Sequence, residues 1–400
     1  MTQYTDVPIF DFDTHMYETP DALTRYLPDR FKNAIEFVQS GRRTKISILG
    51  KIREFIPNPT FERVAAPGAH EAFYSGQNPE GKSLKEMSHE HAMESIPAFR
   101  EPEPRMKVLE EQGVQQAMVF PTLANLVEHS TAEDPDLTVA VIHALNRWML
   151  DVWGYTYQDR LFMTPVINCA LVDEARRELE YVVENGAKIV LIKPAPVYGY
   201  RGWRSPALPE FDPFWKDVED SGIAVGLHAS QPPLEDYVLK WEPDNSVNVF
   251  EGSAFKYVAL GHREISDMLA SLVCHGTLTR FPKLRIASVE NGSAWIKPLM
   301  DDLEATYAKM PQNFEENPIE VLRRNCWVSP FWEGNVADVV EWLGWDKVLF
   351  GSDWPHPEGL TEPKGFFAYA EGMDEKRTRD FMGDNARRLM NLPVATPAGV

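Results

Sequence analysis

The sequence predicts one (β/α)8 barrel of the α/β class, spanning residues 1–400. Short apolar runs with the length of buried strands alternate along the chain with patterns typical of helices, as parallel strands and their connecting helices do. Eight such runs can be counted, which is the number of strands in this barrel. No G-x-G-x-x-G or G-x-x-x-x-G-K-[ST] loop follows any of them, which argues against an open doubly wound sheet.

The first predicted strand, residues 7–12, ends in a pair of polar side chains. Asp13 and His15 are two positions apart, so on an extended chain they point the same way. A carboxylate oxygen and a neutral imidazole nitrogen both bind zinc, manganese or iron. For the pair alone, an aspartate that caps a turn and a histidine bonded to the backbone is the favoured explanation. A metal site therefore needs further ligands from other strand ends.

The segment after this strand interrupts the regular alternation. A helix is expected over residues 20–37, because its apolar residues recur roughly on one face. Residues 41–104 are rich in proline, glycine and charge, with a short hairpin expected over residues 44–55. Because a connection this long is usually functional, and regular elements flank it, we expect an inserted lid.

The rest of the chain supplies the other units of the barrel. The predicted helices cover residues 105–112, 136–153, 173–185, 212–221, 264–280, 293–309, 317–323 and 335–343, and the predicted strands cover residues 117–121, 161–168, 187–194, 223–229, 284–290, 325–329 and 347–353. A C-terminal extension, residues 361–400, contains a helical stretch at about 375–390 that is expected to pack on the outside of the barrel.

Composition and charge exclude several classes of partner. The chain has 44% hydrophobic residues and a formal net charge of −20, which argues against nucleic acids and anionic membrane surfaces. An anionic small molecule is still compatible, because a bound cation can dominate the local field. The three cysteines form no C-x-x-C motif, and the sequence has neither a secretory signal pattern nor a long apolar run. We therefore expect a cytoplasmic protein that does not enter the membrane.

Polar side chains also end four later strands. Lys193 ends the fourth predicted strand, His228 the fifth, Glu290 the sixth and Asp353 the eighth. In a (β/α)8 barrel the carboxyl ends of all strands surround one site. Together with the pair at the end of the first strand, these groups are the ligand and acid–base types of a metal centre, and packing alone does not explain such a set.

Five stretches of the sequence carry a resemblance to a known family. They read D-F-D-T-H at residues 11–15, R-M-K-V-L-E-E-Q-G-V-Q-Q-A-M-V-F-P-T at 105–122, G-L-H-A-S at 226–230, R-F-P-K-L-R-I-A-S-V-E-N-G-S-A-W at 280–295 and F-G-S-D-W-P-H-P-E-G at 350–359. With these stretches the chain resembles the amidohydrolase superfamily, and within it the branch that includes aminocarboxymuconate-semialdehyde decarboxylase and related aromatic-acid decarboxylases.

This resemblance implies a set of metal ligands. Asp13 and His15 take the place of the first metal-binding pair of the branch, which is commonly H-x-H, while His228 corresponds to the strand-five histidine and Asp353 to the strand-eight aspartate. Two carboxylates and two imidazoles leave an open position on a zinc, manganese or ferrous ion, where water is activated or a substrate oxygen binds. Asp353 can also accept a proton from that water.

Three residues leave the number of metal ions open. Glu290 stands where the decarboxylase relatives usually have an acid–base histidine; it could move a proton if burial raised its pKa, or bind a second ion. Lys193 stands where binuclear relatives have a carbamylated lysine, but pairing with a substrate carboxylate or with Glu290 is the favoured role. Glu18 is a further ligand or a partner of one. We expect one divalent ion, or two.

Three further residues are candidates for substrate binding. Trp203 and Arg204 follow the fourth predicted strand and could contact a ring and an anion, although a solvated loop explains them equally well. His356 lies between two prolines, where it could orient the substrate or cap the turn.

The favoured function is a metal-dependent hydrolase that acts on a small aromatic or cyclic carboxylate-bearing substrate through activated water. Asp353, Glu290 and His228 are its expected catalytic residues, and hydrolysis is preferred because Glu290 replaces the expected histidine. One alternative is a metal-dependent non-oxidative decarboxylase of an aromatic or muconate-type acid. Another is a ligand-binding barrel without catalysis. The expected partners are a small molecule and a second copy of the chain in a homodimer.

Overall fold

The computed structural model describes residues 7–41, 43–230, 235–244, 248, 250–261, 263–331 and 336–394. The ends of the predicted domain (residues 1–6 and 395–400), residue 42 of the predicted insertion and the first residue of the helix expected at 335–343 lie outside the described residues.

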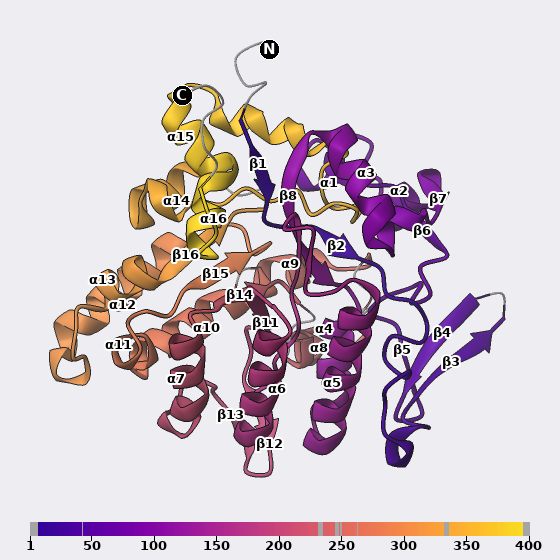
Figure 1. The fold of residues 1–400 in the computed structure, drawn as a ribbon, viewed down its shortest axis with the longest axis horizontal. Helices are drawn as coiled ribbons and strands as arrows, with labels where there is room; N and C mark the ends of the chain where they lie inside the picture. The colour runs from indigo at the N-terminus through magenta and orange to yellow at the C-terminus, as the bar shows by residue number, and fades with distance from the viewer. Residues whose placement is uncertain are drawn as a thin grey trace.

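Two parallel sheets form the centre of the structure (Figure 1). In the first, β1 (Ile9–Asp11) and β10 (Leu161–Met163) flank β8 (Val114–Pro121), and both run parallel to it. β2 (His15–Met16) also pairs with β8, and β9 (Thr156–Tyr157) adds an antiparallel edge beside β10. The last five residues of β8 are all buried, as expected of a strand that is covered on both faces.

The second sheet has the order β11, β14, β15, β16, and all its strands are parallel. These strands cover Ile189–Ile192, Ala224–His228, Ile286–Val289 and Cys326–Ser329. Every residue in them is buried except Trp327, which is half-buried. Short continuous apolar runs are what a sheet covered on both faces requires, so the strands predicted here are confirmed.

Isolated parallel bridges lie at the edges of both sheets. They pair Val166 with Leu191, Val328 with Val348, and Thr14 with Trp354. The strand predicted at 347–353 is present only through such bridges and through backbone hydrogen bonds, in which Phe12 N donates to Phe350 O at 2.8 Å and Asp353 N to Asp13 O at 2.7 Å. These contacts place residues 348–354 beside the carboxyl end of β1.

Helices follow most of the parallel strands and cover them (Figure 1). α3 (Pro102–Gln112) ends as predicted at Gly113, whose φ of 68° is left-handed. The helix expected at 264–280 is split in two at Gly276, whose φ is 73°. None of the described helices is long and apolar enough to span a membrane. The helices between α3 and the C-terminal extension are α4 (Ala124–Thr131), α5 (Pro135–Val152), α6 (Val172–Glu184), α7 (Asp212–Ser221), α8 (Glu235–Trp241), α9 (Ala254–Leu260), α10 (Arg263–Cys274), α11 (Thr277–Arg280), α12 (Ile296–Lys309), α13 (Pro318–Asn325) and α14 (Val336–Leu343).

The helix predicted at residues 20–37 is wrong. The chain makes turns up to residue 26 and a 3₁₀ turn, η1 (Asp29–Phe31), and then enters strand β3 (Ile35–Ser40). Pro28 lies in the middle of the predicted helix and has an extended ψ of 145°. A proline inside a helix removes a backbone donor and clashes with the preceding turn. Leu23 is nevertheless buried. The spacing of the apolar residues therefore indicated that side chains are buried here, but it did not indicate a helix.

The predicted insertion, residues 41–104, contains regular structure. β3 pairs with β4 (Arg43–Ile48), which in turn pairs with β5 (Lys51–Arg53), and both pairings are antiparallel. The hairpin expected at 44–55 is therefore confirmed. A second antiparallel pair, β6 (Arg63–Ala65) and β7 (Ala92–Glu94), flanks α1 (Glu71–Tyr74) and α2 (Leu84–Glu90) in the sequence. Both parts lie on the right-hand side of Figure 1. The action of this segment as a lid stays a prediction.

The C-terminal extension is helical, as predicted. A 3₁₀ segment, η6 (Pro363–Ala370), precedes three consecutive helical pieces: α15 (Glu375–Arg379), the π-helical turn η7 (Asp380–Asp384) and α16 (Asn385–Leu389). Arg387 donates from Nε to Gln116 Oε1 at 2.8 Å and from Nη1 to Pro8 O at 3.1 Å. The extension thus packs against the amino ends of β1 and β8, away from the strand ends that carry the polar residues.

Candidate metal centre

The carboxyl ends of three strands bring the predicted polar residues together. Asp13 and His15 are held by the chain around residue 353, because Asp13 O accepts from Asp353 N at 2.7 Å and His15 N donates to Trp354 O at 2.8 Å. His228 is the last residue of β14, and Glu290 follows β15 directly. Residues far apart in the sequence therefore meet at one point, as the order of the strands predicts.

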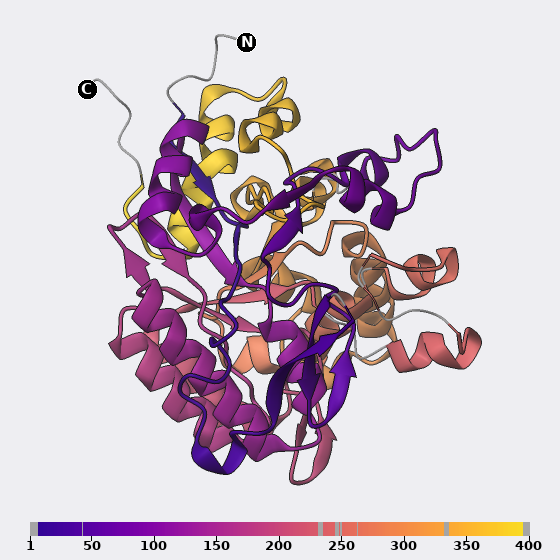
Figure 2. The same cartoon turned by 90° about the vertical axis from the view of Figure 1, so that its right-hand side faces the viewer.

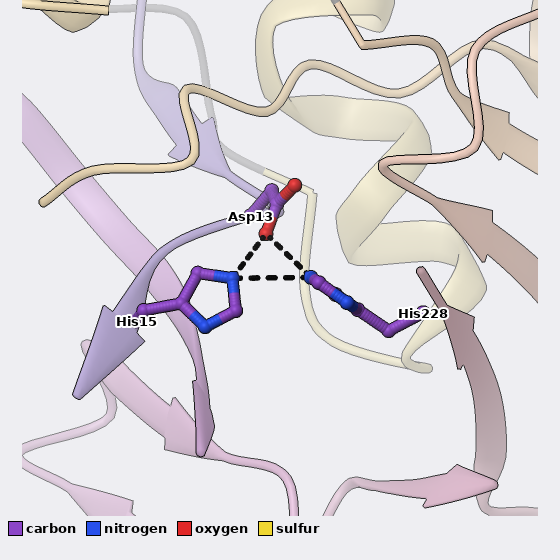
Figure 3. Close-up of side chains that lie close together, drawn as sticks. All are labelled: Asp13, His15 and His228. Carbon is purple, nitrogen blue, oxygen red and sulfur yellow. Dashed lines mark hydrogen bonds and ion pairs between the residues drawn. The ribbon is translucent and has the colours of Figure 1, made fainter. Parts of the chain in front are cut away.

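Asp13, His15 and His228 form the centre of this group (Figure 3). His15 Nε2 lies 3.1 Å from His228 Nε2 and 3.5 Å from Asp13 Oδ1, and His228 Nε2 lies 3.4 Å from the same oxygen. All three side chains are buried. Ligand atoms held about 2.0–2.2 Å from one zinc-type ion lie roughly 3.0–3.6 Å from each other. The three donor atoms therefore have the spacing that a single divalent cation requires.

Asp353 extends the group on one side. Its Oδ1 lies 3.2 Å from His15 Nε2 and 3.0 Å from His356 Nδ1. The side chain is 1% exposed, and neither carboxylate oxygen has a hydrogen-bond partner among the described residues. Asp353 also has a φ of 59°, a left-handed conformation that a non-glycine residue adopts rarely and mostly where function demands it. A cation would give these oxygens the partner that buried carboxylates need.

Glu290 extends the group on the other side. Its Oε2 lies 3.3 Å from His228 Nε2, and its φ of 58° is left-handed as well. Carboxylate oxygens of Asp13, Glu290 and Asp353 all lie within 4.8 Å of one another. The centre therefore offers a second set of oxygen ligands next to the first set.

Burial shifts the pKa values in this cluster. Burial raises the pKa of Asp353 to about 7, and it raises the pKa of Glu358, which also lines the site, to about 7. Burial lowers the pKa of His15 to about 4, so this imidazole is neutral at pH 7, which is the form that binds metal ions. Burial also acts to raise the pKa of Asp13, but the hydrogen bonds of His15 and His228 to its carboxylate outweigh burial and hold the pKa below its usual value.

The remaining ring nitrogen of His228 is fixed by the backbone. His228 Nδ1 lies 2.7 Å from Ala229 O, and a carbonyl oxygen can only accept, so Nδ1 carries the proton. In the neutral ring this leaves Nε2 as the nitrogen with the lone pair, and Nε2 is the atom that faces Asp13 and His15. The backbone therefore sets the tautomer that a metal ligand needs.

Two buried side chains that the sequence analysis did not single out hold the ligand segments in place. The carboxylate of Asp11 accepts from Ser352 N at 2.9 Å and from Ser352 Oγ at 2.6 Å. Arg105 is fully buried, donates from Nε to Ala98 O at 2.7 Å and from Nη2 to His15 O, and lies over the ring of Trp354 at 4.5 Å. Asp11, Arg105 and Glu358 all fall within the stretches that carry the family resemblance, which is the signal that could have identified them.

Four predicted site residues belong neither to the donor groups of this centre nor to the lining of the cavity beside it. Glu18 is buried and its Oε1 accepts from Leu123 N at 2.7 Å, with burial raising its pKa to about 8. Lys193 lies in a separate small pocket together with Glu128. Trp203 and Arg204 belong to β13 (Gly202–Arg204), which pairs only with β12 (Val197–Gly199); Trp203 is 53% exposed and Arg204 Nε lies 2.7 Å from Glu210 Oε1.

A cavity of about 730 Å³ opens next to the centre. His15, His228, Glu290 and His356 are among its lining residues. His356 Nε2 lies 3.0 Å from Thr122 Oγ1, so this ring is held between the threonine and Asp353. The structure thus places the predicted substrate contact His356, unlike Trp203 and Arg204, at the cavity.

One family model matches the chain. It is described as Amidohydrolase and covers residues 86–392. The match includes His228, Glu290, Asp353 and His356, whereas Asp13 and His15 precede it. No curated protein matches the chain.

Several solved structures are similar to the chain. A crystal structure of an amidohydrolase from Mycobacterium avium subsp. paratuberculosis K-10 covers 96% of this chain and 99% of its own, with 34% sequence identity and a TM-score of 0.91. A 5-carboxyvanillate decarboxylase from Novosphingobium aromaticivorans DSM 12444, complexed with manganese and 4-hydroxy-3-methoxy-5-nitrobenzoic acid, has 16% identity, 97% coverage of both chains and a TM-score of 0.64. A dihydroxybenzoic acid decarboxylase from Polaromonas sp. JS666, with bound manganese and the inhibitor 2-nitroresorcinol, has 14% identity, a TM-score of 0.60, and coverage of 98% of this chain and 99% of its own. The last two similarities show the fold alone.

We predict that His228→Ala lowers the metal content of the purified protein at least tenfold, because it removes one of three converging donors, and changes in the ligand environment alone already weaken metal binding by about 10–100-fold. Elemental mass spectrometry of protein loaded with manganese and then desalted measures this. His275→Ala, at the exposed histidine that follows α10 (Arg263–Cys274), is the matched control and should keep the wild-type content. An unchanged metal content in His228→Ala would remove this histidine from the ligand set.

We predict that Arg105→Met destabilises the fold by about 2–4 kcal/mol, because it leaves the buried carbonyl oxygens of Ala98 and His15 without their donor. Urea unfolding followed by circular dichroism measures the change. Arg177→Met, at an exposed arginine of α6 that pairs with Glu174, should leave the midpoint unchanged. Equal midpoints for both variants would show that Arg105 does not hold the ligand segment.

Proposed function

This chain belongs to the amidohydrolase family, and from that membership we propose that it is a metal-dependent, non-oxidative decarboxylase of an aromatic carboxylic acid. The chain is an enzyme of the hydrolase or decarboxylase type, so a ligand-binding barrel without catalysis is not retained. The observation that carries the proposal is the buried cluster of Asp13, His15, His228 and Asp353 at a cavity of about 730 Å³. Two structures of the same fold are decarboxylases of aromatic acids, which supports decarboxylation over the hydrolysis that the sequence alone favours.

The barrel predicted from the sequence is part of this proposal. The two parallel sheets are connected at their edges by the bridges Val166 to Leu191, Val328 to Val348 and Thr14 to Trp354. Taken in order, these pairings lead from β1 through both sheets and residues 348–354 back to the end of β1, which supports a closed (β/α)8 arrangement. In such an arrangement the carboxyl ends of the strands surround one site, where Asp13, His228 and Glu290 lie.

Asp13, His15, His228 and Asp353 are the proposed ligands of one divalent ion. The donor atoms of Asp13, His15 and His228 have the spacing described above, and Asp353 Oδ1 lies 3.2 Å from His15 Nε2. Neither carboxylate oxygen of Asp353 has a hydrogen-bond partner among the described residues. Manganese is the first candidate because two structures of the same fold contain it, and zinc and iron suit the same donors. When bound, the ion supplies Lewis acidity that polarises substrate oxygens. Glu290 is the residue that would join Asp13 and Asp353 if a second ion were bound.

Glu290 is the proposed source of the proton. In a non-oxidative decarboxylation the bond between the ring carbon and the carboxylate breaks, carbon dioxide leaves, and the electron pair stays on the ring carbon, which then takes up a proton. Glu290 lines the cavity and lies at the edge of the donor set, 3.3 Å from His228 Nε2. A carboxylic acid in this place can deliver the proton from the substrate side.

Hydrolysis is the second candidate, and one contact favours it. Asp353 Oδ1 lies 3.0 Å from His356 Nδ1, and the Asp353 carboxylate has no hydrogen bond within the described part of the chain. A carboxylate supported by an imidazole can accept a proton from an attacking water. A cytoplasmic location and a homodimer are kept as proposals with no structural feature to support them.

We predict that the manganese-loaded enzyme releases carbon dioxide from at least one hydroxylated aromatic acid, and that Glu290→Gln lowers kcat about 100-fold or more while the metal content stays at the wild-type level. The amide keeps the size of the side chain but cannot donate a carboxyl proton. Trapped carbon dioxide and the hydroxyarene product measure the reaction, and metal is measured on the same sample. Glu304→Gln, at an exposed glutamate of α12, is the matched control.

Two outcomes would contradict this prediction in different ways. Turnover of esters, amides or lactones, with no carbon dioxide from any acid, would replace the decarboxylase by the hydrolase. Full decarboxylase activity in Glu290→Gln would keep the reaction and remove Glu290 as the proton donor.

A further inference from the structure

The cavity beside the candidate metal centre has room for more than a single-ring acid. Its volume of about 730 Å³ lies within the range of pockets that enclose drug-sized ligands. His15 and His228 of the metal centre line part of it. Much of the remaining lining comes from residues 43–65 and 85–92 of the insertion. The strands β4 and β5 of this segment lie in the lower half of Figure 2, and its helices α1 and α2 lie at the upper right. The chain therefore builds walls that extend well beyond the reacting group.

One wall is a column of stacked rings that begins at the metal centre. The rings of His15 and His356 stack with centroids 3.8 Å apart, His356 and Tyr17 with centroids 5.7 Å apart, and Tyr17 and Phe61 with centroids 4.5 Å apart. The planes of each pair lie within 26° of parallel. All four residues line the cavity. Because the faces of these rings are turned toward one another, a planar substrate part placed along this wall meets their edges, and edge-to-face contact is a geometry that aromatic groups prefer.

Phe61, at the outer end of the column, is held in a strained conformation. Its φ is 48° and its side chain is buried. The left-handed region is unfavourable for a bulky residue and costs about 1–3 kcal/mol. Phe61 N donates to Asn58 O at 3.1 Å, and Arg100 Nη2 donates to the carbonyl of the preceding Thr60. The turn thus holds the ring against Tyr17 in spite of the strain.

The lining of the cavity combines different kinds of side chain. Phe55, Ile56 and Phe250 add apolar lining beyond the metal centre, and Phe250 is fixed by an edge contact with the buried ring of His70 at 5.0 Å. The charged lining residues of the insertion are exposed, as expected at a mouth; they are Arg43, Glu62, Arg63 and Lys85. A lining that combines the carboxylates and imidazoles of the metal centre, several rings and exposed charged residues matches an acid with an apolar body.

We propose that the substrate is an aryl carboxylic acid with a second ring or an equally large apolar group, whose carboxylate lies at the metal centre and whose apolar group lies against Phe55, Phe61 and Phe250. This inference rests on the proposed function for the placement of the carboxylate, and it names the substrate class of the same site. The insertion, which supplies Phe55 and Phe61, then determines specificity, while the strand ends supply the chemistry.

The test compares the binding of two acids that carry no ring hydroxyl and differ by one ring, benzoate and biphenyl-4-carboxylate. Their dissociation constants are measured by isothermal titration calorimetry with the manganese-loaded full chain. We expect biphenyl-4-carboxylate to bind at least tenfold more tightly, because burying a second ring is worth more than the 1.4 kcal/mol that corresponds to tenfold. Equal affinities would overturn the inference.

Matched variants locate the second ring. Phe55→Ala and Phe250→Ala, at two half-buried rings of the lining, should each weaken biphenyl-4-carboxylate binding about three- to tenfold and change benzoate binding less than twofold. Phe314→Ala, at a half-buried ring next to η4 (Pro311–Asn313) and away from this cavity, should change neither. A loss that is equal for both acids, or no loss in either lining variant, would contradict the placement.

Failure of this inference can be told apart from failure of the proposed function. Binding is measured without turnover, so a preference for biphenyl-4-carboxylate that depends on Phe55 and Phe250 supports the substrate class even if no acid is decarboxylated. Decarboxylation of single-ring acids without any preference between the two probes would instead keep the function and overturn the substrate class.

Discussion

The structure depends on one constraint, which is that several carboxylates are removed from water at the same point. Asp13 and Asp353 are 2% and 1% exposed, and both have an oxygen within 4.8 Å of one on Glu290. The ion-pair partners of Asp13 and Asp353 within the described residues are histidines. Burial keeps His15 neutral at pH 7. Burial also acts to lower the pKa of His228, but the hydrogen bond and the charge of Asp13 outweigh burial and raise this pKa, so the positive charge of one imidazole faces several carboxylates. Buried charges of one sign destabilise a fold unless they are compensated. A divalent cation compensates this set and at the same time becomes its reactive group, so stability and chemistry are linked here.

The backbone around the centre is arranged to hold these groups close together. Asp353 and Glu290 both have left-handed backbones, which persist only where the surroundings leave no alternative. Asp11 binds both the amide and the hydroxyl of Ser352, directly before Asp353. Arg105 binds the carbonyl oxygen of His15 on the other side. The segments with Asp13 and Asp353 are 340 positions apart in the sequence, and these buried contacts join them independently of any ligand.

Much of the fold and the centre of the site could be predicted from the sequence. Short apolar runs indicate the strands, and the order of the strands is enough to bring their carboxyl ends together. Lys193 shows the limit. Ile192 is paired with Leu227, so Lys193 would lie level with His228 if β11 continued, but the strand ends at Ile192 and the chain turns, with Ala195 N donating to Lys193 O at 2.8 Å. The exact residue at which a strand ends depends on tertiary contacts, and no local sequence pattern contains these. For the same reason, the spacing of apolar residues in 20–37 correctly indicated that some of these side chains are buried, but wrongly predicted a helix.

The outer cavity follows a different logic from the centre. The reactive groups lie on the ends of buried strands, where hydrogen bonds and packing fix them, whereas Phe55, Phe61 and Phe250 lie in segments that connect those strands. The two connecting segments also contact each other, since Lys85 Nζ lies 2.7 Å from Glu251 Oε1 and the ring of Phe73 lies 5.8 Å from that of Tyr257. Connecting segments tolerate sequence change far better than core strands do. Changes in these segments can therefore alter which acid fits without disturbing the metal ligands, so the part of the sequence that is hardest to predict is also the part that sets the choice of substrate.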